Sequence, residues 1–493
     1  MPLPTSCPAC PAERRTVASR HVPASPALLR LAGVTLVATI WAGLGAGVRD
    51  ARAAGDPDAN KILLASRTTR LANGLEVTLR EDHRTPIVAV NLWYHVGSKD
   101  EPTGKDGFAH LFEHLMFQGS KHVPEDTYFL DLERAGASNI NGTTSSDRTN
   151  YFETVPKNRL ELALWLESDR MGFLLDHVDQ KTFEGQREVV KNERRQNYEN
   201  APAGLVVQYV DEALFPPTHP YHHLTIGSPQ DLDAATLEDV KEFFRAHYLP
   251  NNASLVIAGD IDPDATLRLV EQYFGPVPRG VVPMVPSIAK VELLGETRLE
   301  IEAGIELPRV EVAWPTPAYF APGDGDLDLL ARALTGGKTS RLYKRLVYDE
   351  QIAQDVSAYQ ESRQLGSKFV VSATAKPGHT PEELLAAIDQ EIAKVQTSGL
   401  GDAELARART AFLAGEAFGL ETVTAQSNTI NTFVHYTGDP GYMPRNLARY
   451  ELATAATVGE AARTWLPAGK RVVAIVRAVP GAPLAGRLVR RTP

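Results

Sequence analysis

The pentapeptide His110-Leu-Phe-Glu-His114 constrains this chain more than any other stretch. Leu, Phe and Met surround it and no proline interrupts it, which favours a helix. Residues three and four apart share one helix face, so His110, Glu113 and His114 are expected to point the same way. Two imidazoles one turn apart can hold one zinc ion, and the carboxylate between them can reach a water on it. The alternative is a pair of helix-face histidines that bind no metal.

A zinc site of this kind needs a third protein ligand, which we expect to be a carboxylate on a later helix. The segment from Gln186 to Asn197 is charged, is helical in propensity and lies downstream at a domain-scale distance. It offers two carboxylates, Glu188 and Glu193.

With this segment the chain resembles the pitrilysin/insulinase family of zinc peptidases, especially half-length members similar to mitochondrial processing peptidase and bacterial periplasmic relatives. That family carries H-x-x-E-H, the mark of the inverted zincins, and a later segment like E-R-x-V-x-x-x-E. The closing Glu of that segment matches Glu193, with 78 residues between it and His114, whereas Gln186 replaces the opening Glu. The resemblance implies that His110, His114 and Glu193 bind one zinc ion per chain. Glu188 remains as an alternative ligand or as a group that supports the ligands.

Zinc with three protein ligands keeps a fourth position for water and lowers the pKa of that water towards ~7. Glu113 precedes a ligand directly, so it is better placed to take the proton of the water and pass it to a leaving amine. We therefore expect a zinc endopeptidase that cleaves peptides inside a chamber, with zinc-bound water as nucleophile and Glu113 as general base. The alternatives are a non-catalytic or structural subunit and a zinc hydrolase of a non-peptide substrate.

The segment Ser138-Asn-Ile-Asn-Gly-Thr-Thr144 resembles the edge strand on which this family pairs the substrate backbone. The resemblance makes Asn141 a substrate-binding residue near the scissile bond. A turn is the alternative, because Asn141 precedes Gly142 and Asn-Gly is a strong turn signal. Three further histidines are expected to belong to a loop against the cavity and not to a metal site: His219, His222 and His223.

The order of expected elements in the first half repeats in the second half at an offset of about 217–222 residues. Residues 275–286 hold four prolines and mark the boundary between the halves. We expect an α+β fold of two homologous halves, each a mostly antiparallel sheet with helices packed on it, which forms half of a clamshell chamber. The expected parts are a signal peptide (1–53), a metal-binding peptidase domain (62–275), a Pro-rich linker (276–294) and a non-catalytic homologous domain (295–482).

The second half is expected to hold no active centre. When Gly119 is aligned with Gly337, the positions of the two histidines and the glutamate fall on residues that cannot reproduce the site: Asp328, Ala331 and Arg332. Members of the family that act alone also carry an Arg and a Tyr, seven residues apart, in the second half. Val347 and Gln354 stand at these positions here. The resemblance therefore implies a heterodimer with a relative that lacks H-x-x-E-H and carries the Arg/Tyr pair. The alternative is a homodimer that grips the substrate through Arg345 or Tyr348.

The first 53 residues combine a basic front, an uncharged run (Leu31 to Val48) and a small-x-small sequence, Ala51-Arg-Ala53. They predict a cleaved signal peptide, a periplasmic protein and no stable membrane anchor; an uncleaved leader that anchors the chain in the membrane is the alternative. Both cysteines, Cys7 and Cys10, lie in this segment, so a cysteine protease is excluded. Removal of its six arginines and two acids takes the net charge from −10 to −14. A protein with this negative charge would repel the phosphates of nucleic acid, so we expect no nucleic-acid partner. Peptides remain the expected substrates.

Overall fold

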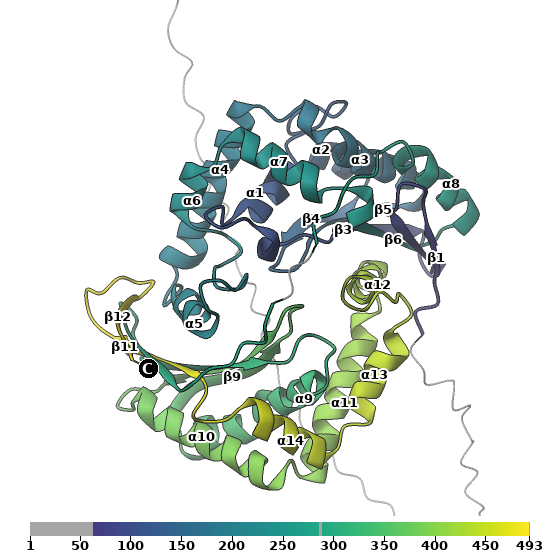
Figure 1. Ribbon diagram of the computed structural model, residues 1–493. Helices are drawn as coiled ribbons and strands as arrows, with labels where there is room; N and C mark the ends of the chain where they lie inside the picture. Colours follow the sequence, from purple (N-terminus) through teal and green to yellow (C-terminus); the bar gives the residue numbers. More distant parts are fainter. Residues whose placement is uncertain (1–62, 285–287, 493) are drawn as a thin grey trace, which may run out of the picture. The chain divides into compact units, whose positions relative to one another are not determined.

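The computed structural model describes residues 63–284 and 288–492. The expected signal peptide, with its cleavage point and both cysteines, lies outside the described residues, and so do residues 285–287 of the expected linker. The described residues form two six-stranded sheets with helices packed on them (Figure 1). This arrangement confirms the expected α+β class.

The first sheet lies in the N-terminal half. Its strands are β1 (Arg67–Arg70), β2 (Glu76–Glu81), β3 (Ile87–Tyr94), β4 (Ser138–Thr144), β5 (Thr149–Pro156) and β6 (Ala253–Gly259). They follow the order β1-β2-β6-β3-β5-β4, and neighbours are antiparallel except β2 and β6. β1 and β2 form a hairpin, in which Gly74 has a φ of 95° that glycine adopts without strain. Asn73 fixes this turn by donating from Nδ2 to the carbonyls of Phe274 and Val277, at 2.8 and 2.9 Å.

The second sheet repeats this arrangement in the C-terminal half. Its strands are β7 (Thr297–Ala303), β8 (Arg309–Thr316), β9 (Ala353–Glu361), β10 (Ser367–Ala375), β11 (Val472–Ala478) and β12 (Arg487–Thr492). Their order is β12-β7-β11-β8-β10-β9, and the single parallel pair is β7 with β11. The run β7-β11-β8-β10-β9 therefore matches β2-β6-β3-β5-β4 strand for strand. This match confirms two homologous halves.

Helices occupy similar places between the strands of both halves. The first half contains α1 (Phe108–Leu115), α2 (Tyr128–Arg134), α3 (Leu160–Phe173), α4 (Gln180–Arg194), α5 (Val206–Leu214), α6 (Pro229–Ala234), α7 (Leu237–His247) and α8 (Pro263–Phe274). The second half contains α9 (Asp324–Thr335), α10 (Pro381–Ser398), α11 (Asp402–Gly419), α12 (Val423–Thr437), α13 (Met443–Glu451) and α14 (Ala455–Trp465). The described residues also form two π-helices, η4 (Arg195–Glu199) and η6 (Tyr343–Asp349). Among these residues, α2 and α8 of the first half have no α-helical counterpart in the second.

Each half has its own hydrophobic core on one face of its sheet. In the first half, Val90 and Leu92 of β3 are fully buried against the helical layer, where Phe112 of α1 stacks on Phe243 and Phe244 of α7. This packing fixes α1, with its apolar side inward, against the sheet. The helix that carries the H-x-x-E-H pattern is therefore anchored by its aromatic and aliphatic residues.

The opposite face of each sheet is covered by a helix from the other half. Helix α12 lies on β3 and β6 of the first sheet, where Ile430 and Val434 pack against Val256. Helix α5 lies on the second sheet, where Val210 joins a cluster with Val472. Because α5 and α12 hold equivalent places in the two halves, this exchange of helices is reciprocal. A sequence boundary near residue 275 separates the two sheets but leaves each half without the helix that covers its second face.

Buried polar contacts accompany this exchange. Asn431 of α12 donates from Nδ2 to the carbonyl of Asn91 at 2.9 Å and accepts from Oγ of Ser254 at 2.8 Å. In the other half, Lys368 of β10 donates to Asp211 of α5 at 2.5 Å, and both side chains are almost inaccessible to solvent. The two halves are thus joined by specific hydrogen bonds as well as by apolar packing.

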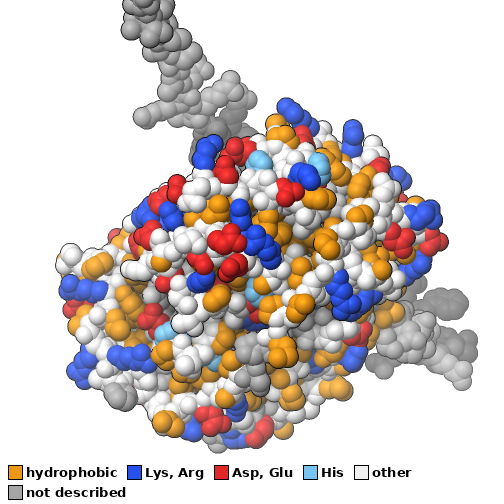
Figure 2. Space-filling model, turned by 45° about the horizontal axis from the view of Figure 1, so that its top comes forward, with side chains coloured by type: hydrophobic (Ala, Val, Ile, Leu, Met, Phe, Trp, Pro, Cys, Tyr) orange, Lys and Arg blue, Asp and Glu red, His pale blue; other side chains and the backbone are white. Residues whose placement is uncertain are grey.

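The visible surface carries acidic and basic side chains side by side (Figure 2). This pattern differs from the continuous basic face that a nucleic-acid-binding protein presents to phosphates. Among the described helices, none combines the length and the apolar character needed to span a membrane.

Candidate metal centre

Helix α1 begins at a well-defined cap. Gly107 precedes it with a φ of 101°, a left-handed conformation that favours glycine. The buried carboxylate of Glu101 accepts the backbone N–H groups of Gly107 and Ala109 at 2.9 and 2.8 Å. Burial raises the pKa of Glu101, whereas these two hydrogen bonds oppose the rise. Sequence reasoning missed Glu101, because it stands in an irregular loop and only the folded chain brings it to the helix.

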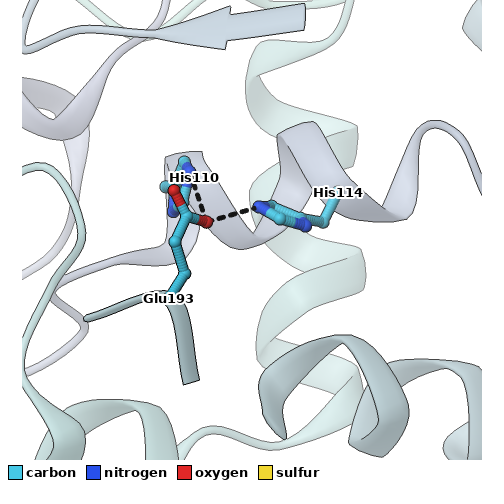
Figure 3. A group of neighbouring side chains, drawn as sticks. All are labelled: His110, His114 and Glu193. Carbon is cyan, nitrogen blue, oxygen red and sulfur yellow. Dashed lines mark ion pairs between the residues drawn. The ribbon is translucent and has the colours of Figure 1, made fainter. Parts of the chain in front are cut away.

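The expected metal-binding side chains meet in space (Figure 3). Nε2 of His114 lies 3.3 Å from Oε2 of Glu193, and Nε2 of His110 lies 3.7 Å from the same oxygen. The three donor atoms lie within 4.8 Å of one another. Tetrahedral zinc with bonds of about 2.1 Å separates neighbouring ligand atoms by about 3.4 Å. The nitrogen and carboxylate donors and their spacing therefore fit a zinc ion.

Glu193 reaches this group from the last turn of α4, which packs against α1. Glu188, one and a half turns earlier on α4, does not join it: its carboxylate contacts Lys191 at 2.9 Å, and its side chain is 55% exposed. Glu188 therefore lies apart from the three donor side chains in this structure. Gln186, on the same helix as Glu188, lies beside His114 instead. Its hydrogen bond to His114 opposes the lowering of the His114 pKa.

Burial sets the charge of the two imidazoles. It lowers the pKa of His110 to about 3, and the neighbouring His114 adds to that effect. Burial also lowers the pKa of His114, against the opposing influence of Glu193 and Gln186. Both rings are thus neutral near pH 7. A neutral imidazole offers a nitrogen lone pair, which is the form that binds a metal.

Glu113 lies on the same helix face but outside the three-residue group. Burial raises its pKa to about 7, and the negative charge of Glu193 acts in the same direction. A hydrogen bond from Thr144 and the positive charge of Arg148 oppose this rise. A carboxyl group with a pKa near neutrality can both accept and release a proton under ordinary conditions.

Strand β4 forms the outer edge of the first sheet next to this group. In the described residues it pairs with β5 alone, and Asn141 stands opposite Phe152. Asn141 and Gly142 both lie within the strand, so the alternative of a turn at this Asn-Gly pair is wrong. Asn141 is exposed. A Cβ at Gly142 would come within 3.1 Å of Cγ of Glu113, so glycine allows β4 to lie directly against that side chain.

The His-rich loop stays apart from the Glu193 group. His222 donates from Nδ1 to the carbonyl of Phe215 at 2.7 Å. His223 lines a cavity of about 380 Å³ bounded by residues of both halves, as expected for a loop against the cavity. His223 also lies 3.7 Å from Glu101 and 3.8 Å from Asp106. Both oxygens of Glu101 accept backbone N–H groups at the start of α1, so Glu101 serves as the cap of this helix.

Helix α9 is the counterpart of α1, and Gly323 caps it with a φ of 94°, as Gly107 caps α1. When α1 and α9 are aligned on these cap glycines, the correspondence between the two helices differs by two residues from the one based on Gly119 and Gly337. The positions equivalent to the histidines and glutamate of α1 then become Asp326, Leu329 and Leu330. Both leucines are fully buried. Neither register places a histidine on α9.

The structure also places Val347 and Gln354, the residues at the positions of the family's Arg/Tyr pair. Val347 lies on η6 and packs against the core of the second half, and Gln354 follows the first residue of β9. Arg345 forms ion pairs with Glu350 at 2.7 Å and Glu391 at 3.1 Å. Its guanidinium is therefore occupied within its own half.

Two neutral imidazoles, a carboxylate donor and a neighbouring carboxyl group form an arrangement typical of the inverted zincins. Residues 76–224 match the family model described as insulinase (peptidase family M16), and residues 234–412 match the peptidase M16 inactive domain. The chain belongs to this family of peptidases. The first match includes the complete centre, and most of the second lies in the half that lacks one.

Relatives and solved structures agree with this assignment. The chain is 29% identical over 352 residues to the zinc protease PqqE of Helicobacter pylori. The aligned region covers 70% of this chain and 78% of that protein. It is 23% identical over 401 residues to the beta subunit of the mitochondrial-processing peptidase of Saccharomyces cerevisiae, covering 76% and 82%.

A crystal structure of a protease from Helicobacter pylori matches with a TM-score of 0.79 and 25% identity, over 84% of this chain and all of that one. The periplasmic protease PqqL from Escherichia coli shares the fold, with a TM-score of 0.70 and 17% identity. The match covers 84% of this chain but 48% of PqqL. This chain therefore corresponds to about half of that longer protein.

Proposed function

We propose that this protein is an exported zinc-dependent endopeptidase. The observation that carries the proposal is the convergence of His110, His114 and Glu193 on one point, with Glu113 beside them. The family assignment supports zinc and peptide hydrolysis, since relatives are named zinc proteases. We assign His110, His114 and Glu193 as ligands of one zinc ion per chain, and Glu113 as the general base.

A zinc ion at this centre acts as a Lewis acid, so that a water becomes nucleophilic near neutral pH. Glu113 accepts a proton from this water and then donates it to the nitrogen of the leaving amine. Its pKa of about 7 suits both transfers. The scissile C–N bond breaks without a covalent link to the protein. The neutral rings of His110 and His114 keep their lone pairs available throughout.

The outer edge of β4 supplies the binding surface for a peptide. Unpaired backbone groups on an edge strand can add an extended peptide as a further strand. We assign Asn141, which is exposed on this strand, to contact with the substrate near the scissile bond. A peptide bound along β4 passes directly over Glu113, because Gly142 lies against that side chain.

Glu113→Gln tests the proposed function. We expect the variant to keep zinc and to lose about 10²–10⁴-fold in turnover of a mixed peptide library, because only the proton acceptor changes. Unchanged turnover would remove Glu113 from the mechanism. Zinc without hydrolysis in the wild-type protein and its complexes would favour a non-catalytic subunit. Hydrolysis of small esters without peptides would favour a zinc hydrolase of a different substrate class.

We further propose that the active form is a heterodimer. The chain spans about half of PqqL, so a second chain of similar size would make up the length of the longer protein. Val347 and Gln354 cannot supply the charged hydrogen bonds of the expected Arg/Tyr pair, and Arg345 is engaged in ion pairs. We propose a partner of similar size that lacks H-x-x-E-H and supplies this pair. A homodimer that uses Tyr348, which is 73% exposed, is the alternative.

Co-expression with the relative encoded nearest to this chain tests the heterodimer. We expect a complex of one copy of each, and peptide cleavage at least about tenfold faster than that of this chain alone. Full activity of this chain alone, unchanged by the relative and abolished by Tyr348→Ala, would support the homodimer instead.

Export is proposed from the leader sequence. Mass spectrometry of the protein from its native source is expected to find an N-terminus near Ala54, in a periplasmic fraction. An intact leader in the membrane fraction would contradict this assignment and support the anchored alternative.

A further inference from the structure

Thr144, the last residue of strand β4, is bonded directly to the proposed general base. Its Oγ1 donates to Oε2 of Glu113 at 2.6 Å. This distance is typical of a hydroxyl bonded to an ionised carboxylate, which is stronger than a neutral hydrogen bond. The bond joins the strand that is proposed to hold the substrate to the side chain that is proposed to move the proton.

This bond makes the two oxygens of the Glu113 carboxylate different from each other. Thr144 occupies Oε2, and the hydrogen bonds among the described residues leave Oε1 without a protein donor. The terminal torsion of a glutamate is broad, so an unrestrained carboxylate samples many orientations. A base must stay within hydrogen-bond distance of the proton that it removes. With Oε2 fixed, Oε1 is held ready for a water.

The strand end that carries Thr144 is itself rigid. Arg148 donates from Nη1 to the carbonyl of Thr143 at 2.8 Å and to Oδ1 of Asn150 at 3.1 Å. Its guanidinium also lies over the ring of Trp93, 4.9 Å from the centroid. The side chain of Thr144 is stiff as well, because threonine branches at Cβ. A fixed donor on a fixed strand can orient its acceptor.

The adjoining loop is anchored to the second half of the chain. Asp147 accepts from the hydroxyl of Tyr436 on α12 at 3.0 Å and from the backbone N–H of Gln364 at 2.9 Å. The exchange of helices between the halves thus extends to within a few residues of Thr144. Several independent contacts hold the hydroxyl in one place.

From these contacts we infer that Thr144 is a positioning residue, which orients the Glu113 carboxylate and couples it to the substrate-binding edge of β4. The inference rests on the proposed function. Thr144 itself touches neither the proposed metal nor the reacting bond. Its contribution is to the orientation of the base and therefore to the rate of turnover more than to substrate affinity.

Thr144→Val removes the hydroxyl at constant shape, and Thr144→Ser restores it. We expect Thr144→Val to lower kcat by about 10–100-fold, with KM within about twofold and zinc content unchanged. Thr144→Ser should recover kcat to within about threefold of the wild type. The matched control is Thr374→Val, because Thr374 also donates to a carboxylate, that of Asp355 at 3.2 Å, on a strand pair of the second half. This control should behave as the wild type.

Crystal structures of the metal-free wild type, Thr144→Val and Thr144→Ser give a readout that does not depend on activity. We expect one Glu113 conformer in the wild type and in the serine variant, and a turned or multiple conformer in Thr144→Val. An unchanged Glu113 in Thr144→Val, or a serine variant as slow as the valine variant, would overturn the inference. If the wild type cleaves no peptide but the structures differ as expected, the proposed function fails while the positioning role stands.

Discussion

The two halves of this chain share one order of five strands, similar helix positions and one kind of helix cap. Among the described residues, only the first half brings together side chains that could hold a metal ion. Helix α1 turns His110, Glu113 and His114 towards Glu193, whereas the equivalent face of α9 carries an aspartate and two buried leucines. The sheet, the core and the glycine cap all persist in the second half. The difference therefore shows that the metal centre is a small set of side chains placed on a fold that is stable without it.

The same comparison explains what the second half retains. Each sheet gains a helix from the other half, so the half without a metal group still covers one face of the half that has one. This reciprocal packing is present although α9 carries no histidine. The second half is thus a structural requirement of the first, whatever further surface it offers to a substrate.

The largest effect on zinc binding and turnover should come from removal of a proposed ligand in the first half. A substitution at the equivalent position of the second half should have no effect. His110→Ala and Glu193→Ala should each reduce bound zinc from about one ion per chain to a small fraction, and turnover by at least about 10³-fold. Asp326→Asn, at the position of α9 equivalent to His110, should change neither. Metal analysis and a peptide assay measure both quantities. Zinc retained in Glu193→Ala but lost in Glu188→Ala would move the third ligand to Glu188.

The helix exchanged into the second half relies on a buried ion pair. Asp211→Ala leaves the ammonium of Lys368 buried without its nearest partner and should lower the free energy of unfolding by about 3 kcal/mol. The control is Asp233→Ala, which removes an exposed partner of Lys191 and should cost less than about 1 kcal/mol. Urea unfolding compares the two. Equal losses would mean that α5 is held by apolar packing alone.

The helix exchanged into the first half relies on a neutral amide. Asn431→Ala removes a fully buried side chain that bonds Asn91 and Ser254, and should cost about 2 kcal/mol in the free energy of unfolding. Asn428→Ala, exposed on the same helix, should be close to neutral. A measurable loss in both variants would point to helix propensity, and not to the contact with the first sheet, as the cause.

Acid should weaken the same junction, by a smaller amount for each histidine than the loss expected for Asp211→Ala. The rings of His95 and His435 meet at 4.9 Å where α12 covers the first sheet. Burial lowers the pKa of His95 to about 4 and that of His435 well below its usual value. The unfolded chain binds protons below pH 6.5 while these folded rings do not, so stability present above pH 6.5 is lost as the pH falls towards 4. The loss should reach about 1–2 kcal/mol per histidine at pH 5.

His435→Phe tests this pH dependence, since both ring nitrogens of His435 are buried without a hydrogen-bond partner among the described residues. Thermal unfolding at pH 7 and pH 5 should show a smaller acid-induced shift in the variant than in the wild type. Equal shifts would assign the acid sensitivity to other groups.

Features with a local cause were predictable from the sequence. The spacing of His110, Glu113 and His114 places them on one face of any helix, and the apolar residues between them make that helix pack. The Asn73-Gly74 turn and the alternating strands have equally local signals. The repeat of element order was also sufficient to predict two similar halves, because each strand and helix carries its own pattern.

Features that depend on contacts between distant residues were not predictable in this way. Glu101 at the cap of α1 and Thr144 at the base are ordinary loop and strand residues until folding brings them to the helix. Glu188 and Glu193 stand five apart on one helix, and only the packing of α4 on α1 decides which of them faces the histidines. The register of α9 also shifted by two residues, because the cap glycines align where Gly119 and Gly337 do not.

The reciprocal exchange of α5 and α12 also bears on the order in which the protein is assembled. Strands β3 and β6 leave the ribosome long before α12, which ends at Thr437. The apolar side chains of Val256 and Ala258 therefore have no cover until most of the chain has been synthesised. A chain interrupted before that point would expose this sheet face to solvent. Full cover of the sheet that carries the candidate metal centre thus arrives late in synthesis.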